Sequence, residues 1–125
     1  MASQRFTKAH RVRRRGEFQR VFDLSLRVKG RYLTVLMAPN AAGVGRLGIV
    51  ASRKLGDAVR RNRAKRLIRE IFRLTPPVHI RQGVDVVVIP RRELFDAGYP
   101  SLESDFRGAL TRCAARLPVP ADAAR

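Results

Sequence analysis

Cysteine and histidine are almost absent from the sequence, and this scarcity excludes two classes of small protein. The chain has one cysteine, Cys113, and two histidines, His10 and His79, among 125 residues. One thiol cannot form an internal disulfide, and these three side chains do not make up a tetrahedral zinc site of the usual kind. Disulfide-stapled scaffolds and zinc fingers are therefore excluded.

Long apolar runs are also missing. No segment approaches the roughly 18 apolar residues that a membrane span requires. Residues 1–15 lack the apolar stretch of a signal peptide. Because neither a membrane span nor an export signal is found, we expect a cytoplasmic protein without a membrane partner.

Acidic residues are few beside the basic ones. The sequence has 10 aspartates and glutamates against 27 lysines and arginines, which gives a formal net charge of +17. Self-repulsion of this size destabilises a compact chain unless an anion accepts the charge. The charge balance therefore indicates a polyanionic partner, and nucleic acid is the first candidate.

The hydrophobic content is sufficient for one packed domain. Hydrophobic residues make up 45% of the 125 residues, which excludes simple disorder and allows one core of ordinary size. We expect a single domain over residues 1–125, with an ordered core over about 11–117 and flexible ends.

Hydrophobic periodicity predicts the order helix, strand, strand, helix, strand, helix. The predicted elements cover residues 16–24, 31–38, 46–52, 58–74 and 83–90, followed by a last helix that Ser101 caps. We expect the first two strands to pair as an antiparallel hairpin across a long loop, and the third to be central and buried. This order is typical of a small α+β or α/β sandwich.

Capping residues predict where the two long helices begin. Asp57 is the expected N-cap of the helix over 58–74, which two following prolines end. Ser101 is the expected N-cap of the last helix, with Glu103 and Asp105 in its first turn, where acidic groups favour the helix dipole. One stripe of this helix is apolar and is expected to be buried; it consists of Leu102, Phe106, Ala109, Leu110, Cys113 and Leu117.

The helix over 58–74 separates into an apolar and a basic side on a helical wheel. The apolar side consists of Ala64, Leu67, Ile68, Ile71 and Leu74, and the basic side of Asn62, Lys65, Arg66, Arg69 and Arg73. The positive charge is extended by Arg53, Lys54, Arg60, Arg61 and Arg63. A solvated helix face mixes charges of both signs, and this one has almost no acids to pair with. Phosphate groups are therefore the expected ligands, because arginine binds them in a bidentate way.

Residues 51–73, with the sequence ASRKLGDAVRRNRAKRLIREIFR, resemble the signature of the bacterial ribonuclease P protein family. The matching residues are Ser52, Arg53, Lys54, Gly56, Ala58, Val59, Arg61, Asn62, Arg63, Lys65, Arg66, Leu67, Ile68, Arg69 and Glu70. The resemblance continues in EFQRVF as the family's first helix, in RYLTVLM and RLGIVAS as its hairpin, and in DVVVIPRRE as its last strand. It covers about residues 11–117.

The resemblance implies a fold, which is an α+β sandwich of the ribosomal protein S5 domain 2 type. Its order would be α-β-β-α-β-α, with room for an additional short strand and with a left-handed crossover between parallel strands around the basic helix. General rules of chain topology favour the opposite hand, because such crossovers are right-handed in about 98% of cases.

The resemblance also implies a function in tRNA maturation. In the family, the protein is a subunit of an endonuclease whose catalytic RNA cleaves precursor tRNA at the 5′ end of the mature sequence. The reaction uses divalent metal ions, here expected to be Mg²⁺, and the protein alone is not expected to be catalytic. The expected partners are the ribonuclease P RNA and precursor tRNA, and not DNA.

The resemblance assigns residues to two RNA contacts. The catalytic RNA would be bound by Arg53, Lys54, Arg61, Asn62, Arg63, Lys65, Arg66 and Arg69. A cleft between the first helix and the sheet would hold the single-stranded 5′ leader of precursor tRNA through Phe18, Phe22, Tyr32, Thr34, Leu36 and Ser52. Strand alternation places Tyr32, Thr34 and Leu36 of the predicted strand 31–38 on one face. Without the resemblance, Phe18 and Phe22 are better interpreted as core anchors of a short helix.

The sequence offers no catalytic or metal-binding constellation of its own. The acidic residues are scattered, and Asp85 alone lies in a predicted strand. His79 has no evident acid–base partner, and Ser52 has no nearby histidine to activate it. Cys113 lies on an apolar stripe, where a buried structural thiol is more common than a nucleophile. We therefore expect hydrolysis to belong to the RNA, and no metal or cofactor to be bound by the protein alone.

Two alternatives remain open. A small basic ribosomal or structural RNA-binding protein would share the charge, the size and the fold, but it would lack a leader cleft. A helix-turn-helix DNA-binding protein agrees less well with the sequence. In this chain the basic helix is followed by two prolines and a buried strand, and not by a second helix.

Overall fold

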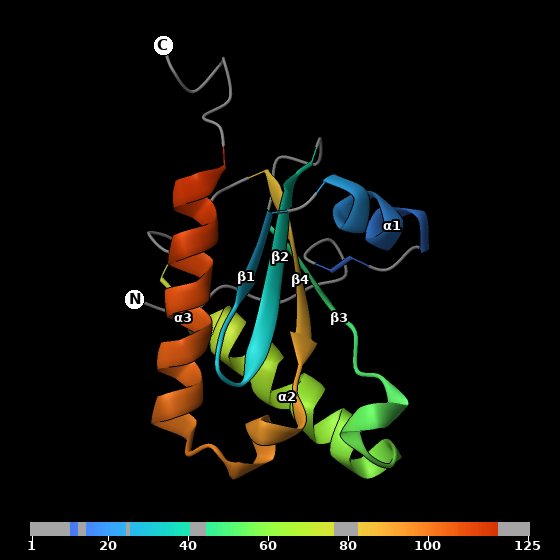
Figure 1. Ribbon diagram of the computed structural model, residues 1–125, viewed down its shortest axis with the longest axis vertical. Helices are drawn as coiled ribbons and strands as arrows, with labels where there is room; N and C mark the ends of the chain where they lie inside the picture. The colour runs from blue at the N-terminus through green and yellow to red at the C-terminus, as the bar shows by residue number, and fades with distance from the viewer. Residues whose placement is uncertain (1–10, 13–14, 25, 41–44, 77–82, 118–125) are drawn as a thin grey trace.

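The computed structural model describes residues 11–12, 15–24, 26–40, 45–76 and 83–117 (Figure 1). The ends predicted to be flexible, and the segments that contain His10 and His79, lie outside the described residues. Within the described part, no helix is both long and apolar enough to cross a membrane.

The elements form a mixed α+β domain with helices on both faces of one sheet, which confirms the predicted fold class. They are α1 (Arg15–Leu24), β1 (Leu26–Lys29), β2 (Leu33–Pro39), β3 (Arg46–Ile49), α2 (Ala58–Leu74), β4 (Val84–Pro90) and α3 (Tyr99–Arg116). Two short 3-10 helices, η2 (Arg53–Leu55) and η4 (Arg92–Asp96), precede α2 and α3. The additional short strand for which the fold leaves room is β1.

The strand order in the sheet is β1-β2-β4-β3, and it corrects one prediction. β2 and β3 do not form a hairpin, because β4 lies between them, antiparallel to β2 and parallel to β3. The reason is that β4 is apolar toward both faces of the sheet: Val86 and Val88 belong to one core cluster and Val87 to the other. A strand that is buried on both faces is most stable between two neighbours. The connection from β3 through α2 to β4 is therefore a parallel crossover, and its left hand stays a prediction.

The two faces of the sheet are covered unequally. The larger core cluster lies under α2 and α3, and β2 contributes Leu33, Val35 and Met37 to it. The smaller cluster lies under α1, where Val21 packs against Leu36 of β2. Figure 1 shows α1 beside one end of the sheet and α2 near the other end. Val12 lies beside α1 on the same face, because a Cβ at Gly48 of β3 would meet both Phe18 of α1 and Val12.

α2 begins and ends as the sequence predicts, and one of its apolar positions is a correction. The carboxylate of Asp57 accepts a hydrogen bond from the backbone N–H of Arg60 at 3.0 Å, which confirms the N-cap. Leu74 is 43% exposed. Phe72 takes the inner position in the last turn, because α3 brings Phe106 there, with the two rings stacked 6.5 Å apart.

The predicted start of α3 is wrong. The helix begins at Tyr99 with Gly98 as N-cap, and no side chain caps it. Pro100 lies in the first turn, where its missing N–H costs no hydrogen bond, and this placement moves the start upstream of Ser101.

The acidic residues expected in the first turn of α3 have other contacts. Glu103 forms an ion pair with Arg107 at 3.4 Å. Asp105 accepts hydrogen bonds from the backbone N–H groups of Arg31 and Tyr32, at 3.0 and 2.9 Å. Asp105 therefore attaches α3 to the turn between β1 and β2.

The predicted apolar stripe of α3 is confirmed as the inner side of the helix. Leu102, Phe106, Ala109, Leu110, Cys113 and Leu117 are all buried. Burial raises the pKa of the Cys113 thiol to about 11. Cys113 is therefore a neutral side chain of the core near pH 7.

Candidate nucleic-acid interface

The polar side of α2 faces solvent, as the helical wheel predicts. Arg60, Asn62, Arg63 and Arg66 are exposed, and Arg61, Lys65, Arg69 and Arg73 are half-buried; we call this surface the basic helix face. Glu70 accepts a hydrogen bond from Arg73. In the part of the chain that the structure describes, no other cation of the basic helix face has an ion-pair partner.

Two arginines of the basic helix face are partly withdrawn from water and have no counter-ion among the described residues. Burial, and then repulsion from Arg11, lower the pKa of Arg69. The Nε of Arg61 is buried and has no hydrogen-bond partner among the described residues. An external phosphate would relieve the repulsion and supply the missing acceptor. These two positions are therefore suited to an anionic ligand.

The 3-10 helix η2 brings Arg53 and Lys54 next to the N-terminal end of α2, and both side chains are exposed. Gly56 joins the two helices with a φ of 133°, and a Cβ there would lie 2.8 Å from Cδ of Arg60. Glycine is required at such a backbone conformation. Ser52 is exposed and its side chain does not cap η2, so its hydroxyl is accessible.

A buried carboxylate inside the sheet organises the contact with α1. Asp85 of β4 has no exposed surface, and its two oxygens accept hydrogen bonds from Arg46 of β3 at 2.7 and 2.8 Å. Asn40, directly after β2, donates a further bond to Asp85 at 2.7 Å. The bond between Arg46 and Asp85 raises the pKa of Arg46, so the guanidinium stays charged.

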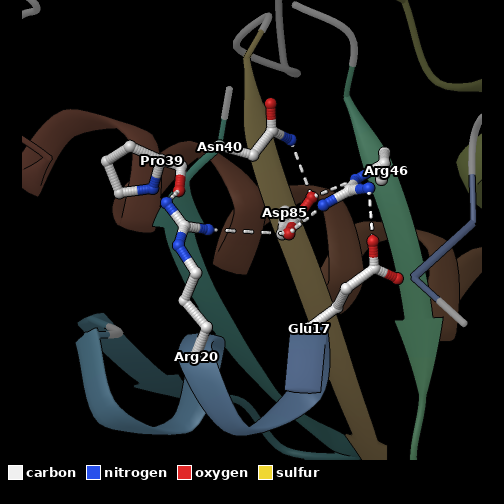
Figure 2. A network of polar contacts seen from close by, with 6 residues as sticks. All are labelled: Glu17, Arg20, Pro39, Asn40, Arg46 and Asp85. Carbon is white, nitrogen blue, oxygen red and sulfur yellow. Dashed lines mark hydrogen bonds and ion pairs between the residues drawn. The ribbon is translucent and has the colours of Figure 1, made fainter. Parts of the chain in front are cut away.

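α1 is joined to this buried pair at two positions (Figure 2). Glu17 accepts a hydrogen bond from Arg46 at 2.8 Å. Arg20 lies 3.9 Å from Asp85 and donates to the carbonyl oxygen of Pro39. We refer to Glu17, Arg20, Asn40, Arg46 and Asp85 as the Asp85 cluster. This cluster fixes the position of α1 relative to β3 and β4.

Sequence reasoning missed the Asp85 cluster, because its members are far apart in the chain and share no periodicity. One signal was available. A carboxylate within an otherwise apolar, β-branched strand has to find a cation when it is buried. The residue 83–90 pattern therefore predicts a basic partner for Asp85, although it does not say which one.

The two phenylalanines of α1 have different environments. Phe18 is half-buried and packs on the smaller core cluster, and a Cβ at Gly48 of β3 would lie 2.7 Å from its ring. The ring of Phe18 thus lies against the sheet at Gly48, a strand position that has no side chain. Phe22 is 38% exposed. Phe22 is therefore accessible for stacking, whereas Phe18 mainly packs α1 against the sheet.

The residues predicted on one face of β2 do not stay together. Thr34 lies on the same sheet face as Leu36 and is 9% exposed, but Leu36 is fully buried under α1. Leu36 therefore cannot contact a ligand, and its predicted place in the leader cleft is wrong. Tyr32 precedes β2, so strand alternation does not apply to it; its ring packs on the larger core cluster, under Arg31 at 5.4 Å. The prediction that Tyr32 shares a face with Thr34 is wrong.

β1 supplies cations that sequence reasoning did not assign. Arg27 pairs with Leu36 and Lys29 pairs with Thr34, and both basic side chains are exposed. Paired residues project to the same face of a sheet, so these cations border the region beside α1. We call Phe22, Arg27, Lys29 and Thr34, with the half-buried Phe18, the α1 face. The alternation in LRVK, with Leu26 and Val28 turned inward, was the available signal.

Acidic side chains do not gather in the part of the chain that the structure describes. No three histidine, cysteine, aspartate or glutamate side chains there lie close enough together to hold a metal ion.

The fold and these two surfaces define a class, which is a basic α+β domain of the RNA-binding kind. Residues 6–114 match the family described as Ribonuclease P. The ribonuclease P protein component of Thermotoga petrophila is 44% identical over 92 residues, which are 74% of this chain and 78% of the relative. That of Clostridium botulinum is 36% identical over 97 residues, or 78% and 87% of the two chains.

Solved structures agree with these relatives. The RNase P protein of Thermotoga maritima has a TM-score of 0.73 and 37% identity, over 82% of this chain and 96% of that one. The RNase P protein of Staphylococcus aureus has a TM-score of 0.74 and 34% identity, over 87% and 97%. The chain belongs to the ribonuclease P protein family, whose members are components of a ribonucleoprotein that processes tRNA. The resemblance drawn from residues 51–73 is thereby confirmed.

Proposed function

We propose that the chain is the protein subunit of cytoplasmic ribonuclease P, with one RNA on each of its two surfaces. The basic helix face binds the catalytic RNA, and the α1 face binds the 5′ leader of precursor tRNA. The observation that carries this proposal is the unpaired state of the cations of α2 other than Arg73, within the described residues.

The basic helix face suits a folded RNA. Arginines at several positions along one helix match phosphates that lie at irregular spacing, and each guanidinium binds a phosphate through two hydrogen bonds. The residues assigned to this contact are Arg53, Lys54, Arg61, Asn62, Arg63, Lys65, Arg66 and Arg69. If about six phosphates are engaged, the logarithm of the binding constant falls with the logarithm of salt concentration with a slope near −4, at roughly −0.7 per phosphate.

The α1 face suits a single strand of variable sequence. The exposed ring of Phe22 offers a stacking platform that accepts any base, and Arg27 and Lys29 neutralise backbone charge without reading sequence. The resemblance also assigns Thr34, which is 9% exposed, and Ser52, which precedes η2, to the leader contact. Phe18 contributes by seating α1 on the sheet, and the Asp85 cluster holds the helix in that position.

Cleavage belongs to the RNA subunit in this proposal. The RNA and its divalent metal ions, with Mg²⁺ expected, supply the hydrolytic chemistry. The protein holds the leader and lowers the electrostatic cost of bringing two polyanions together. This division agrees with the chemistry of the α1 face, which offers cations and an exposed aromatic ring.

Reconstitution tests the proposal. The purified full chain is mixed with ribonuclease P RNA at low magnesium concentration, and cleavage of precursor tRNA is followed. We expect the protein to stimulate cleavage at the 5′ end of the mature sequence, and a chain with Arg66→Ala and Arg69→Ala to stimulate it less. Binding to the RNA without stimulation would indicate a structural RNA-binding protein instead.

A further inference from the structure

An open cavity of about 580 Å³ lies between the N-terminal part of α2 and η4, apart from the α1 face. Its lining consists of Arg60, Arg63, Arg92, Glu93, Phe95 and Asp96. A cavity of this size is in the range of small-ligand sites. It borders the basic helix face, with which it shares two arginines, but its chemistry differs because it also contains an aromatic ring and two carboxylates.

A guanidinium lies over the aromatic ring of the cavity. Phe95 is half-buried against the larger core cluster, which fixes its ring. The guanidinium of Arg60 lies over this ring at 5.5 Å from the ring centroid. Guanidinium planes and aromatic rings are the surfaces on which unpaired RNA bases stack. The pair of Arg60 and Phe95 therefore provides a platform on which one flat base can stack.

The charged side chains around this platform do not form ion pairs with one another within the described residues. Arg63, Arg92, Glu93 and Asp96 form no ion pair within the described residues, although arginines and carboxylates line the same cavity. The arginines can bind an anion, and the carboxylates can accept hydrogen bonds from donor groups. A nucleotide supplies both, with its phosphate at one end and its base edge at the other.

Among the four RNA bases, guanine is the best hydrogen-bond partner for a carboxylate. Its Watson–Crick edge carries two adjacent donors, N1–H and the N2 amino group, which match the two oxygens of one carboxylate. Adenine, cytosine and uracil each place an acceptor next to their donor, and an acceptor is repelled by a carboxylate. A carboxylate of the lining would therefore accept guanine more readily than another base, and the arginines would accept phosphate.

We propose that this cavity binds one unpaired guanosine nucleotide of the RNA partner. The base stacks on Arg60, its Watson–Crick edge donates to Glu93 or Asp96, and its phosphate binds Arg63 and Arg92. The proposal rests on the proposed function only in naming RNA as the source of the nucleotide.

The test is a titration of the full chain with the 5′-monophosphates of guanosine, adenosine, cytidine and uridine, followed by NMR shifts of backbone amides. We expect guanosine monophosphate to bind about tenfold more tightly than the others, near the low end of the discrimination of one bidentate base contact. The shifts should concentrate on residues 58–63 and 91–97. A Glu93→Gln, Asp96→Asn double variant should lose the preference, whereas the charge-matched Asp23→Asn, Glu103→Gln double variant should keep it.

Equal affinity for the four nucleotides, or shifts that spread evenly along α2, would overturn the assignment in favour of plain charge attraction. The same samples are tested for binding to ribonuclease P RNA. Tight RNA binding without a guanosine preference would contradict the guanosine site and leave the proposed function standing. Failure to bind that RNA removes the proposed function.

Discussion

The two basic regions of the molecule use their arginines in opposite ways. On α2, the basic helix face leaves its cations without acidic partners, except for Arg73, within the described residues. Beside α1, Arg46 is bonded to Asp85 and Glu17, and Arg20 lies next to Asp85. The net charge of +17 does not distinguish these two uses. The position of each arginine relative to buried acids decides whether it is available to a ligand.

Burial explains the difference. A carboxylate without exposed surface, such as Asp85, is tolerated only when cations and hydrogen bonds replace its water. Arg46 and Arg20 meet this requirement and hold α1 against the sheet. The exposed arginines of α2 face no such requirement, and their mutual repulsion is relieved when a polyanion binds.

The largest expected effect is the loss of stability when the Asp85 carboxylate is removed from the Asp85 cluster. We expect Asp85→Ala to lower the free energy of unfolding by about 3–5 kcal/mol, because it leaves the partly buried Arg46 without its main counter-ion. Urea denaturation of the purified chain measures this, with Asp23→Ala, an exposed aspartate of the same region, as the control. A loss similar to that of the control would mean that the cluster does not stabilise the fold.

The basic helix face is expected to behave in the opposite way. Arg66→Ala combined with Arg69→Ala should leave the unfolding free energy nearly unchanged. It should weaken binding to ribonuclease P RNA by about tenfold or more per arginine, since a hydrogen bond to a charged group contributes roughly 1.5–3 kcal/mol. It should also make the salt slope shallower by about 1.4, at roughly 0.7 per phosphate.

The matched control for that variant is Arg112→Ala with Arg116→Ala, which removes the same charge from the exposed side of α3. Filter binding or fluorescence anisotropy at several salt concentrations measures both double variants. Equal losses in the two would show that only net charge matters and that the basic helix face has no special role.

The sequence predicts α2 well because all of its determinants are local. Asp57 caps it, and its apolar and basic residues repeat with the helical period. Strand pairing is not local, so the predicted hairpin of residues 31–38 and 46–52 was wrong. The information that separates β2 from β3 lies in β4, which is apolar on both sides.

The candidate site was predicted in part, for the same physical reason. The cations of α2 follow from its period, and Phe22 follows from the resemblance. Leu36 and Tyr32 were misplaced, because burial under α1 and the true start of β2 depend on how distant elements pack. The link between Asp85 and Arg46 joins two strands whose adjacency is set by the sheet order.

Phe22→Ala tests whether the α1 face contacts RNA or only packs. We expect it to weaken binding of precursor tRNA to the holoenzyme by about 1–3 kcal/mol, the range for one base stacked on an aromatic ring. Binding of mature tRNA, which has no leader, should change little. Phe18→Ala is the contrasting variant, because its ring packs against Gly48, and it should lower the unfolding free energy by up to about 3 kcal/mol. Equal losses for precursor and mature tRNA with Phe22→Ala would return this residue to a packing role.

The smallest expected effect concerns the cations beside α1 that lie outside the Asp85 cluster. Arg27→Ala with Lys29→Ala should weaken binding of precursor tRNA by less than about 1 kcal/mol per residue, because both side chains are exposed and water screens their charge. The loss should shrink further as salt is raised and should be absent for mature tRNA. Anisotropy titrations of the holoenzyme with both tRNAs measure it. A large, salt-independent loss, or one accompanied by lower stability, would place these residues with Arg46 among the structural cations, and the distinction between the two arginine groups would then fail on the α1 side.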